Sequence, residues 1–549
     1  MSNNLVSSES TSSESSRSTT TTLYRGGLVH SPADSRATAM VVVNGQIAWI
    51  GSDDDAARHS DGVDAVVDLD GALVTPTFVD AHAHTSATGM ALRSVELTGV
   101  RSAAEALARI EDGARKRHGR PVYAPNWDED AWPEHRPLTA EELDRATYGG
   151  VVFSPRVDFH SAVISSALAA ASGARDLPGW NDSGLVTRDA HYAARDTFSA
   201  GISPADRRAD IGSALKAAAA VGIGLVHEVA GPYLSSAEDL VDVLAAGEDG
   251  DGPQVIAYWA ELVADEAQAR ALAERHGVRG LAGDLNIDGS IGSRTASLRA
   301  PYVDGHGPRD GDSTASCGNA YLTVEQVRDH VAACTLAGIQ AGFHVIGDAG
   351  TDTVVEGMRA AAALIGPARV VAGRHRLEHL EMVDAAGIRA LVELGVTASV
   401  QPAFDAFWGG SDGMYAARLG RDRAMGMNPY AAMAAAGMSL AFGSDAPITP
   451  FAPWQAVRAA VNHHEPAQRI SAETAFLAHT RGGWRAAGID DRGFLDLGQP
   501  ATFAIWSLGD DAPTGTTGLP DMSPSAALPI NLRTVIRGRT VFDREGALS

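Results

Sequence analysis

The sequence predicts an α/β protein: a (β/α)8 TIM barrel with a subdomain inserted after strand 1, plus a small β-sandwich formed by both termini. Two observations indicate the barrel, namely eight apolar runs suited to buried strands and Ala-rich segments that close with Gly directly before the next run. A third observation indicates the sandwich, because alternating strand-like runs occur at both ends of the chain. The 549 residues leave room for all three parts.

The two termini are expected to share one domain. Residues 1–22 form a Ser/Thr-rich tail that we expect to be disordered, and they lack the apolar segment of a secretion signal. Next, "LYRGGLVH" and "TAMVVVNGQIAWIGS" indicate strands, with "NG" as a hairpin turn, and "ATFAIWSL" and "LRTVIRGRTVFD" alternate in the same way. We predict a composite β-sandwich from residues 23–74 and 490–549, with two unrelated hairpins as the alternative.

The barrel is expected over residues 75–489. Its repeating unit is a helix, a Gly that can cap the helix in the left-handed conformation, and a β-branched strand, as in "VAACTLAGIQAGFHV". More than 120 residues separate the first two strands, too many for a loop, so residues from about 90 to 205 should form an inserted subdomain beside the barrel mouth. The expected strands lie near residues 76–81, 223–228, 254–260, 283–288, 340–345, 374–379, 396–400 and 439–445.

Composition narrows the class of partner. The formal net charge of −24 disfavours binding to a phosphate backbone and favours a small-molecule substrate over nucleic acid. No 18-residue apolar stretch indicates a membrane span, so no membrane partner is expected. The two cysteines cannot build a disulfide framework, which favours the cytoplasm. A homodimer is one assembly that the chain could form.

Ligand-type side chains end several predicted strands. His82 and His84 in "FVDAHAHT" stand one residue apart, on the same side of an extended chain. His344, His379 and Asp445 end strands 5, 6 and 8. Because the carboxyl ends of barrel strands meet at one mouth, these five side chains predict a site for a divalent metal, with Zn²⁺ as the expected ion.

This order of residues, with a sandwich made by both termini, resembles the amidohydrolase superfamily of metal-dependent hydrolases. The local strings are similar to its amidohydrolase-3, or YtcJ-like, branch, which includes N-substituted formamide deformylases. The resemblance covers residues from about 23 to 545, and "DGSIGSRTA" is its most branch-specific part. The strings are "NWDEDAWPEHRPLT", "VDFHSA", "IDGSIGSRTASL", "FHVIGDAG", "RLEH", "SVQPAF" and "GSDAP".

One position departs from the pattern of that branch. Many relatives hold two metals bridged by a carboxylated Lys on strand 4, where this chain has Asp284. Its two lysines, Lys116 and Lys216, lie away from every predicted strand end, which excludes a lysine carbamate. Asp is shorter than a carboxylated Lys by about four atoms, about 5 Å of extended chain, so it should not span the same metals without backbone adjustment.

Two metal arrangements therefore remain. The favoured one has a single ion held by His82, His84, Asp445 and, as a further ligand, His344, with His379 hydrogen-bonded to the water on the ion. The other has two ions, bridged by Asp284 or by Glu228, which ends strand 2 after His227. Glu228 and His227 could equally support the ligands or cap the strand end.

The chemistry implied is hydrolysis. A Zn²⁺-class ion lowers the pKa of water from about 16 towards 7 and polarises a carbonyl. Asp445 is the candidate to take the proton of that water and pass it to a leaving nitrogen, with ligation alone as its other role, and His379 is the second candidate catalytic residue. We predict hydrolysis of a non-peptide carbon–nitrogen bond in a small amide, with an N-substituted formamide or N-acyl compound favoured by the resemblance. The alternatives are a deaminase of an amidine-like ring and a non-catalytic metal-binding scaffold.

Substrate-binding residues are expected around the metal. Ser290 and Arg294 of the "DGSIGSRTA" loop could anchor a polar group, although Gly-rich loops are also plain connectors. Trp127 and His160 of the insertion could line the pocket, although buried aromatics more often belong to a core. Phe404, Trp408 and Trp454 are further candidates for an apolar wall.

Overall fold

The computed structural model describes residues 20–59, 62–129, 132–156, 161–304, 316–509 and 518–548. The predicted disordered tail lies outside these residues except at its end, because Thr21 and Thr22 already belong to strand β1 (Thr21–Arg25). Among the described residues, each helix is too short or too polar to cross a lipid bilayer.

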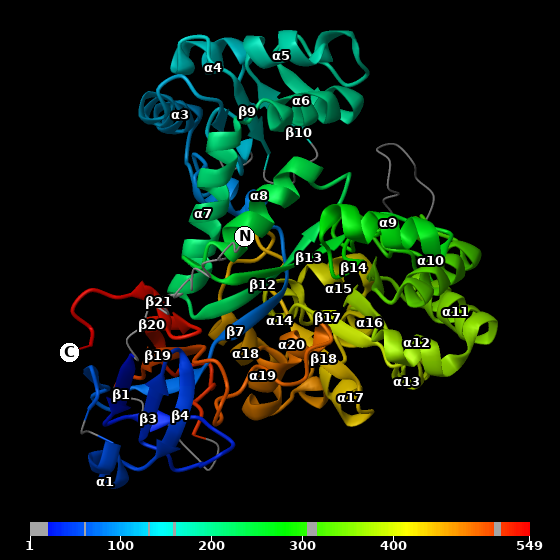
Figure 1. Cartoon of the computed structure of the whole chain (residues 1–549). Coiled ribbons are helices and arrows are strands. Elements are labelled where there is room, and N and C mark those ends of the chain that lie inside the picture. The colour runs from blue at the N-terminus through cyan, green and yellow to red at the C-terminus, as the bar shows by residue number, and fades with distance from the viewer. Residues whose placement is uncertain are drawn as a thin grey trace, which may run out of the picture.

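Eight parallel strands form one sheet in the order β18-β17-β16-β15-β14-β13-β12-β7, which confirms the predicted barrel (Figure 1). Its two edges meet where Ala83 bridges to Ala446 and where the Asp445 N–H donates to the His82 carbonyl (2.7 Å). The strands are β7 (Phe78–Ala83), β12 (Ile223–Ala230), β13 (Gln254–Trp259), β14 (Gly280–Leu281), β15 (Gln340–Val345), β16 (Arg376–His379), β17 (Thr397–Val400) and β18 (Ser439–Phe442).

Helices follow the barrel strands as the Gly-capped pattern predicts. The helix before β15 begins with a capping box between Thr323 and Gln326 and ends at Gly338, whose φ of +74° lies in the left-handed region. Apolar faces of these helices join the inner strands in one continuous core. The helices are α8 (Ala237–Glu248), α9 (Glu266–His276), α10 (Val324–Ala337), α11 (Asp348–Ile365), α12 (Pro367–Gly373), α13 (Ala385–Glu393), α14 (Pro402–Trp408), α15 (Met414–Leu419), α16 (Arg421–Met425), α17 (Tyr430–Ala435), α18 (Pro453–Val461), α19 (Ala472–Ala478) and α20 (Arg481–Ala486).

The fourth barrel strand lies earlier than predicted. We expected it near residues 283–288, but β14 covers Gly280–Leu281, so Asp284 follows the strand instead of belonging to it. The reason is Gly283, whose φ of +91° turns the chain. A Cβ at Gly283 would also lie 2.5 Å from Val229 Cγ1, so only glycine fits there without movement of Val229.

An inserted subdomain separates β7 from β12. It contains a second sheet in the order β11-β10-β9-β8, and Figure 1 shows its elements at the top of the view, with α7 running back to the barrel. Two apolar clusters of its own fill it. The elements are α2 (Thr85–Leu92), α3 (Ala103–Arg117), β8 (Val122–Tyr123), α4 (Ala140–Thr147), β9 (Val152–Pro155), β10 (Ser161–Ile164), α5 (Ser166–Ser172), β11 (Leu185–Thr187), α6 (Arg188–Ala200) and α7 (Pro204–Ala220).

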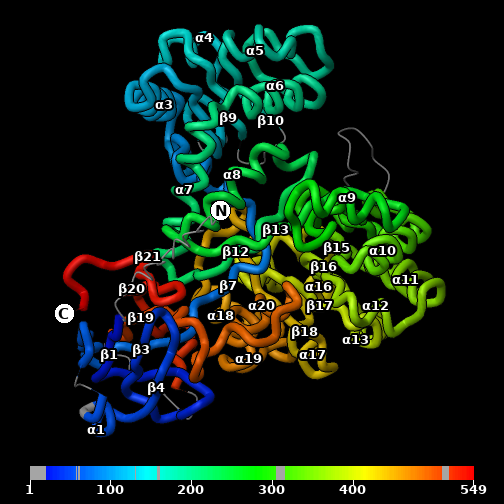
Figure 2. Tube along the Cα trace, viewed as in Figure 1, coloured from blue at the N-terminus to red at the C-terminus, as the bar shows by residue number. Residues whose placement is uncertain are grey.

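Both termini contribute to a pair of packed sheets, in which the blue and red segments lie side by side (Figure 2). One sheet has the order β4-β3-β1-β5 and the other β2-β6-β19-β20-β21, and one apolar cluster contains side chains of both. Asn44 and Gly45 form the β3–β4 turn with φ of +50° and +76°, as an Asn-Gly hairpin requires. The remaining strands are β2 (Leu28–Val29), β3 (Ala39–Val43), β4 (Gln46–Gly51), β5 (Ala65–Asp68), β6 (Leu73–Pro76), β19 (Phe503–Ser507), β20 (Ile530–Ile536) and β21 (Arg539–Asp543).

Candidate metal centre

Four imidazoles gather at the carboxyl ends of the barrel strands. His82 lies within β7 and His84 directly follows that strand, with 5.4 Å between their ring centroids. His344 of β15 and His379 of β16 have centroids 4.5 Å apart, and the His379 ring lies 5.0 Å from that of His82. The structure therefore brings together the four histidines that the sequence singled out.

Two site residues adopt left-handed backbone conformations. In a regular strand, Glu378 and His379 would point to opposite faces of the sheet. The φ of +69° at His379 ends the strand and allows its ring to join the other imidazoles. Asp445, just beyond β18, has a φ of +56°. Such conformations cost about 1 kcal/mol or more for residues other than glycine, and they are characteristic of functional sites.

Two carboxylates lie among these rings. Asp445 Oδ1 is 3.4 Å from His82 Nε2 and 3.2 Å from His84 Nε2. Asp284 Oδ2 is 3.3 Å from His84 Nε2. Its other oxygen, Oδ1, is 3.5 Å from His82 Nε2, 3.6 Å from His344 Nδ1 and 3.7 Å from His379 Nε2. Asp284, which the sequence offered only as an alternative ligand, is thus in contact with all four imidazoles.

The atoms that face inward fit a divalent cation. His82 Nε2, Asp284 Oδ1 and Asp445 Oδ1 are buried and have no hydrogen-bond partner among the described residues. Buried polar atoms left without a partner are costly, and a cation between them would satisfy all three. These atoms belong to three overlapping ligand groups whose members lie within 4.8 Å of one another: His82, His379 and Asp445; His82, His84 and Asp284; and Asp284, His344 and His379.

Each imidazole is held by its other nitrogen. His82 Nδ1 donates to Glu378 Oε2 (2.9 Å), and His84 Nδ1 donates to the Val229 carbonyl (2.9 Å). His379 Nδ1 donates to Gln401 Oε1 (2.8 Å). In the same way, His344 Nε2 donates to the Gly289 carbonyl (3.3 Å). Because a ring nitrogen that donates must carry the proton, the opposite nitrogen keeps the lone pair that a metal needs.

Glu378 and Gln401 are functional residues that the sequence reasoning missed. Glu378 also accepts from Arg376 Nη2 (3.0 Å), and both side chains are fully buried inside the barrel. The Arg376 guanidinium stacks 4.3 Å above the Tyr258 ring. A signal was available, because two charged residues at i and i+2 of a buried strand must share one face and pair there.

The charges in the site act strongly on one another. Burial alone would lower the pKa of His82, but Asp284 and Asp445 raise it to about 10. Burial would raise the pKa of the Asp284 carboxyl, yet His82, His344 and His379 hold it well below its usual range. The two carboxylates therefore make this pocket attractive to positive charge, which is the property that a cation site requires.

Glu228 is not in a bridging position. Its side chain is buried and accepts from the Thr85 N–H (2.8 Å), so it holds the start of α2 next to His84. Burial raises the pKa of this carboxyl to about 7. The neighbouring His227 contacts Arg376 Nη1 through Nδ1 (3.0 Å). Among the described residues, Glu228 does not belong to any group of side chains close enough together to hold a metal ion, and one of its oxygens binds that backbone amide.

The two loop residues predicted to bind substrate differ in their availability. Ser290 is exposed and follows Gly289, whose carbonyl holds His344, so Ser290 lies at the rim of the centre. Arg294 instead forms an ion pair with Asp304 (2.7 Å), which also pairs with Arg418. The charge of Arg294 is therefore already neutralised within the protein.

Of the two insertion residues predicted to bind substrate, the structure describes one, Trp127. Trp127 has no exposed surface, lies in the apolar core of the insertion and donates its indole N–H to the Ser154 carbonyl (2.8 Å). That prediction is wrong because the side chain has no surface left to offer a ligand. His160 lies outside the described residues.

Aromatic side chains border the centre on one side. Phe404 of α14 lies parallel to the His379 ring, at 5.9 Å between centroids, and Trp408 lies 4.8 Å from Phe404. Trp454 is different, since it packs with Phe78 and Trp506 in the barrel core. Of the predicted apolar wall, Phe404 and Trp408 are the members near the metal-binding groups.

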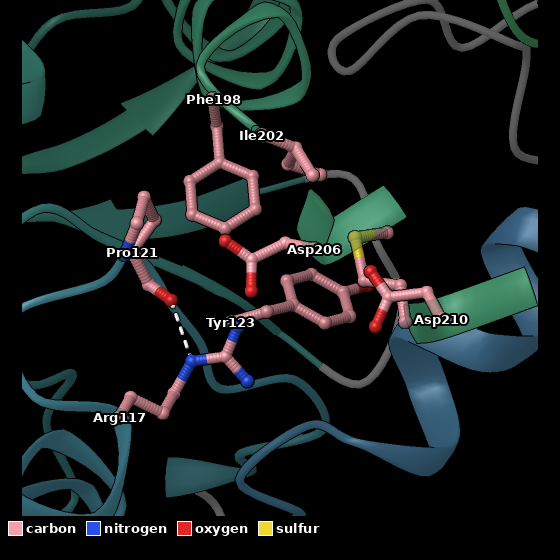
Figure 3. Close-up of a pocket in the computed structure, with 8 residues that line it drawn as sticks. Arg117, Pro121, Tyr123, Phe198, Ile202, Asp206 and Asp210 are labelled. Carbon is pink, nitrogen blue, oxygen red and sulfur yellow. Dashed lines mark hydrogen bonds between the residues drawn. The ribbon is translucent and has the colours of Figure 1, made fainter. Parts of the chain in front are cut away.

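A separate hollow lies between α7 and the other elements of the insertion. Arg117 donates to the Pro121 carbonyl (2.8 Å), as Figure 3 shows, and Asp206 and Asp210 accept from Arg120 and Arg93. The Asp206 and Asp210 carboxylates are therefore paired within the protein, and the hollow lies between packed elements of the insertion. Its lining residues are Met90, Arg117, Pro121, Tyr123, Phe198, Ile202, Asp206 and Asp210.

Comparison with known proteins agrees with this class of site. The solved structure of an uncharacterized metal-dependent hydrolase from Pyrococcus furiosus superposes with a TM-score of 0.73 at 26% sequence identity, over 88% of this chain and 98% of that one. The barrel and its histidine and aspartate groups define a metal-dependent hydrolase.

The family follows from the sequence match. The family model described as "Amidohydrolase family" matches residues 65–542, so the chain belongs to the amidohydrolase family. It is 25% identical to the putative amidohydrolase YtcJ of Bacillus subtilis (strain 168), over 95% of this chain and 99% of that protein. It is also 25% identical to the N-substituted formamide deformylase of Arthrobacter pascens, over 94% and 96%. The resemblance to the YtcJ-like branch is confirmed.

Proposed function

We propose that this protein hydrolyses a non-peptide carbon–nitrogen bond of a small amide. The observation that carries the proposal is the convergence of His82 and His84 on Asp445, at 3.4 and 3.2 Å, at the mouth of an amidohydrolase barrel. His82 Nε2 and Asp445 Oδ1 are buried there without a hydrogen-bond partner among the described residues. These three residues would hold a divalent ion, with Zn²⁺ suited to nitrogen and carboxylate ligands. A cytoplasmic location and a homodimer stay predictions from the sequence.

When bound, such an ion acidifies a water molecule and polarises the carbonyl under attack. Asp445 then has the role of proton carrier, because its Oδ1 is buried at the centre and accepts no hydrogen bond from the described residues. It accepts a proton as the water oxygen bonds to the carbonyl carbon, and it returns the proton to the nitrogen as the carbon–nitrogen bond breaks. Transfer of this kind contributes about 10² to 10⁴ in rate.

The substrate class we propose is an N-substituted formamide or another N-acyl compound. The full-length similarity to the Arthrobacter pascens deformylase supports it. Phe404 stacks on His379, and Trp408 packs against Phe404 with its ring tilted. This aromatic surface supports an apolar substituent on the substrate, because aromatic rings offer a large apolar contact area.

The test is turnover of a panel of N-substituted formamides and N-acyl amines by metal-loaded protein. Asp445→Asn keeps the shape of the side chain but cannot accept the proton, so we expect kcat to fall by about 10² to 10⁴. Metal content and thermal stability of the variant are measured alongside. Stoichiometric metal without turnover of any panel member would count against an amidohydrolase and for a scaffold. Ammonia released without a carboxylic acid would instead indicate a deaminase.

A further inference from the structure

Asp284 occupies the position between two sets of imidazoles. Its Oδ2 lies 3.3 Å from His84 Nε2. Its Oδ1 lies 3.5 Å from His82 Nε2, 3.6 Å from His344 Nδ1 and 3.7 Å from His379 Nε2. One carboxylate is thus in contact with the imidazoles of three different barrel strands, β7, β15 and β16, and with His84 just beyond β7. The side chain is 13% exposed, so few competing water contacts are available to it.

The backbone explains how so short a side chain reaches this position. Beyond β14 the chain turns at Gly283 and then runs beside β15, where the His344 N–H donates to the Leu285 carbonyl (3.1 Å). The Ile287 N–H donates to the His344 carbonyl in turn (2.9 Å). Asp284 is therefore carried inward by its own backbone. The short side chain of Asp284, which favoured a single ion, is therefore no obstacle to a bridge in this geometry.

The spacing of the donor atoms matches metal coordination. Two ligands bound at about 2.1 Å in a tetrahedral site lie about 3.4 Å apart. The separations of His82 and His84 Nε2 from Asp445 Oδ1 are 3.4 and 3.2 Å, and His84 lies 3.3 Å from Asp284. The distances from Asp284 to His344 and His379, 3.6 and 3.7 Å, are close to the same separation between ligands.

The number of donors exceeds what one ion takes. A zinc-class ion binds four ligands, or five at most in a catalytic site, and must keep a position for water. Six side chains converge here: His82, His84, Asp284, His344, His379 and Asp445. His82 and His84 lie 3.4 and 3.2 Å from Asp445, whereas His344 and His379 form a ligand group with Asp284. His379 also lies within 4.8 Å of His82 and Asp445, so the two groups adjoin each other.

We propose that Asp284 is an unmodified carboxylate bridge between two divalent ions, one held with His82, His84 and Asp445 and the other with His344 and His379. The proposal builds on the metal centre of the proposed function, but its test counts metal and not turnover. A carbamate bridge forms from Lys and CO₂, whereas an Asp bridge needs neither. Metal loading of this protein is therefore expected to be independent of bicarbonate.

The experiment is metal titration of chelator-treated full-length protein. Zn²⁺ is added in buffer freed of CO₂ and in buffer with bicarbonate, and bound metal is counted by mass spectrometry after gel filtration. We expect two ions per chain under both conditions. Asp284→Asn should retain at most one, whereas the matched control Asp329→Asn, an exchange at an ion-paired residue of α10, should retain two. One ion per saturated wild-type chain, two in a folded Asp284→Asn, or loading that requires bicarbonate would overturn the proposal.

A second measurement covers the case in which Asp284→Asn does not fold. Wild-type protein is loaded with Mn²⁺ and studied by electron paramagnetic resonance. Two Mn²⁺ ions that share a carboxylate give an exchange-coupled spectrum, which is the expected result. The six-line signal of isolated Mn²⁺ at full loading would overturn the proposal, whether or not the protein hydrolyses any amide.

Discussion

The contact between Glu378 and His82 offers a direct test of how the barrel interior supports the metal centre. Glu378→Gln preserves the shape of the side chain but removes the charge that accepts from His82 Nδ1 and pairs with Arg376. Loss of a carboxylate behind a ligating imidazole typically weakens metal binding by 10-fold to 100-fold, which is about 1.4 to 2.7 kcal/mol.

The same change should lower stability through a separate route. Glu378 and Arg376 are both fully buried, and Arg376 would keep its charge with no carboxylate beside it. Breaking a buried pair by removing one partner lowers the free energy of unfolding by about 3 to 5 kcal/mol. Because Gln can still make hydrogen bonds, we expect a loss of about 3 kcal/mol. The affinity effect and the stability effect can be measured apart.

The assays are chelator competition for Zn²⁺ and urea unfolding of metal-free protein. Ser399→Ala is the matched control, since Ser399 Oγ accepts from Arg376 Nη2 (3.0 Å) but does not contact His82. It should leave metal affinity unchanged. If folded Glu378→Gln bound Zn²⁺ as tightly as the wild type, the idea that Glu378 positions His82 would be refuted.

Two further predictions concern residues outside the centre. Burial lowers the pKa of His330 to about 4, and its ring accepts from the Val263 N–H and donates to the Leu281 carbonyl. Because the unfolded chain protonates near pH 6.5, this neutral histidine contributes stability that is complete above that pH and is lost as pH falls towards 4. We therefore compare the free energies of unfolding in urea of wild type and His330→Gln. Their difference should shift by about 2 kcal/mol in favour of the variant between pH 7 and pH 5. A difference that does not change with pH would contradict this expectation. Trp127→Ala should lower the stability of the insertion by about 3 to 5 kcal/mol in thermal unfolding and leave KM unchanged, whereas a large rise in KM would restore a substrate contact for Trp127.

The sequence predicted what depends on repeated local patterns. Helix, Gly cap and buried strand recur along the chain, and this repeat predicted the barrel. The strand ends that it marked placed five side chains at the barrel mouth: His82, His84, His344, His379 and Asp445. The turn at Gly283 did not follow, because one residue with positive φ shifts a strand without changing its composition. Side-chain length alone therefore could not place Asp284.

Other features depended on contacts between distant parts of the chain. Glu378 and Gln401 hold histidines through single hydrogen bonds. The spacing of Arg376 and Glu378 indicates that these two residues pair, but it does not identify the histidine that Glu378 holds. Trp127 looked like a pocket residue because it stands in a family motif. In the structure its indole packs in the core of the insertion, beside Trp132. A motif can thus mark a residue that holds the fold as readily as one that meets a ligand.

The joining of the two termini in one pair of sheets has a consequence for biosynthesis. The Trp506 indole N–H donates to Thr75 Oγ1 across 431 residues, and β6 has its antiparallel partner only in β19. At a translation rate of about 5 to 20 residues per second, β6 waits about 20 to 90 seconds for that partner. During this time the apolar faces of Tyr24 and Val74 lack Phe503 and Ile505. Nascent chains interrupted before β19 should therefore be substrates for chaperones, while the barrel strands have already left the ribosome.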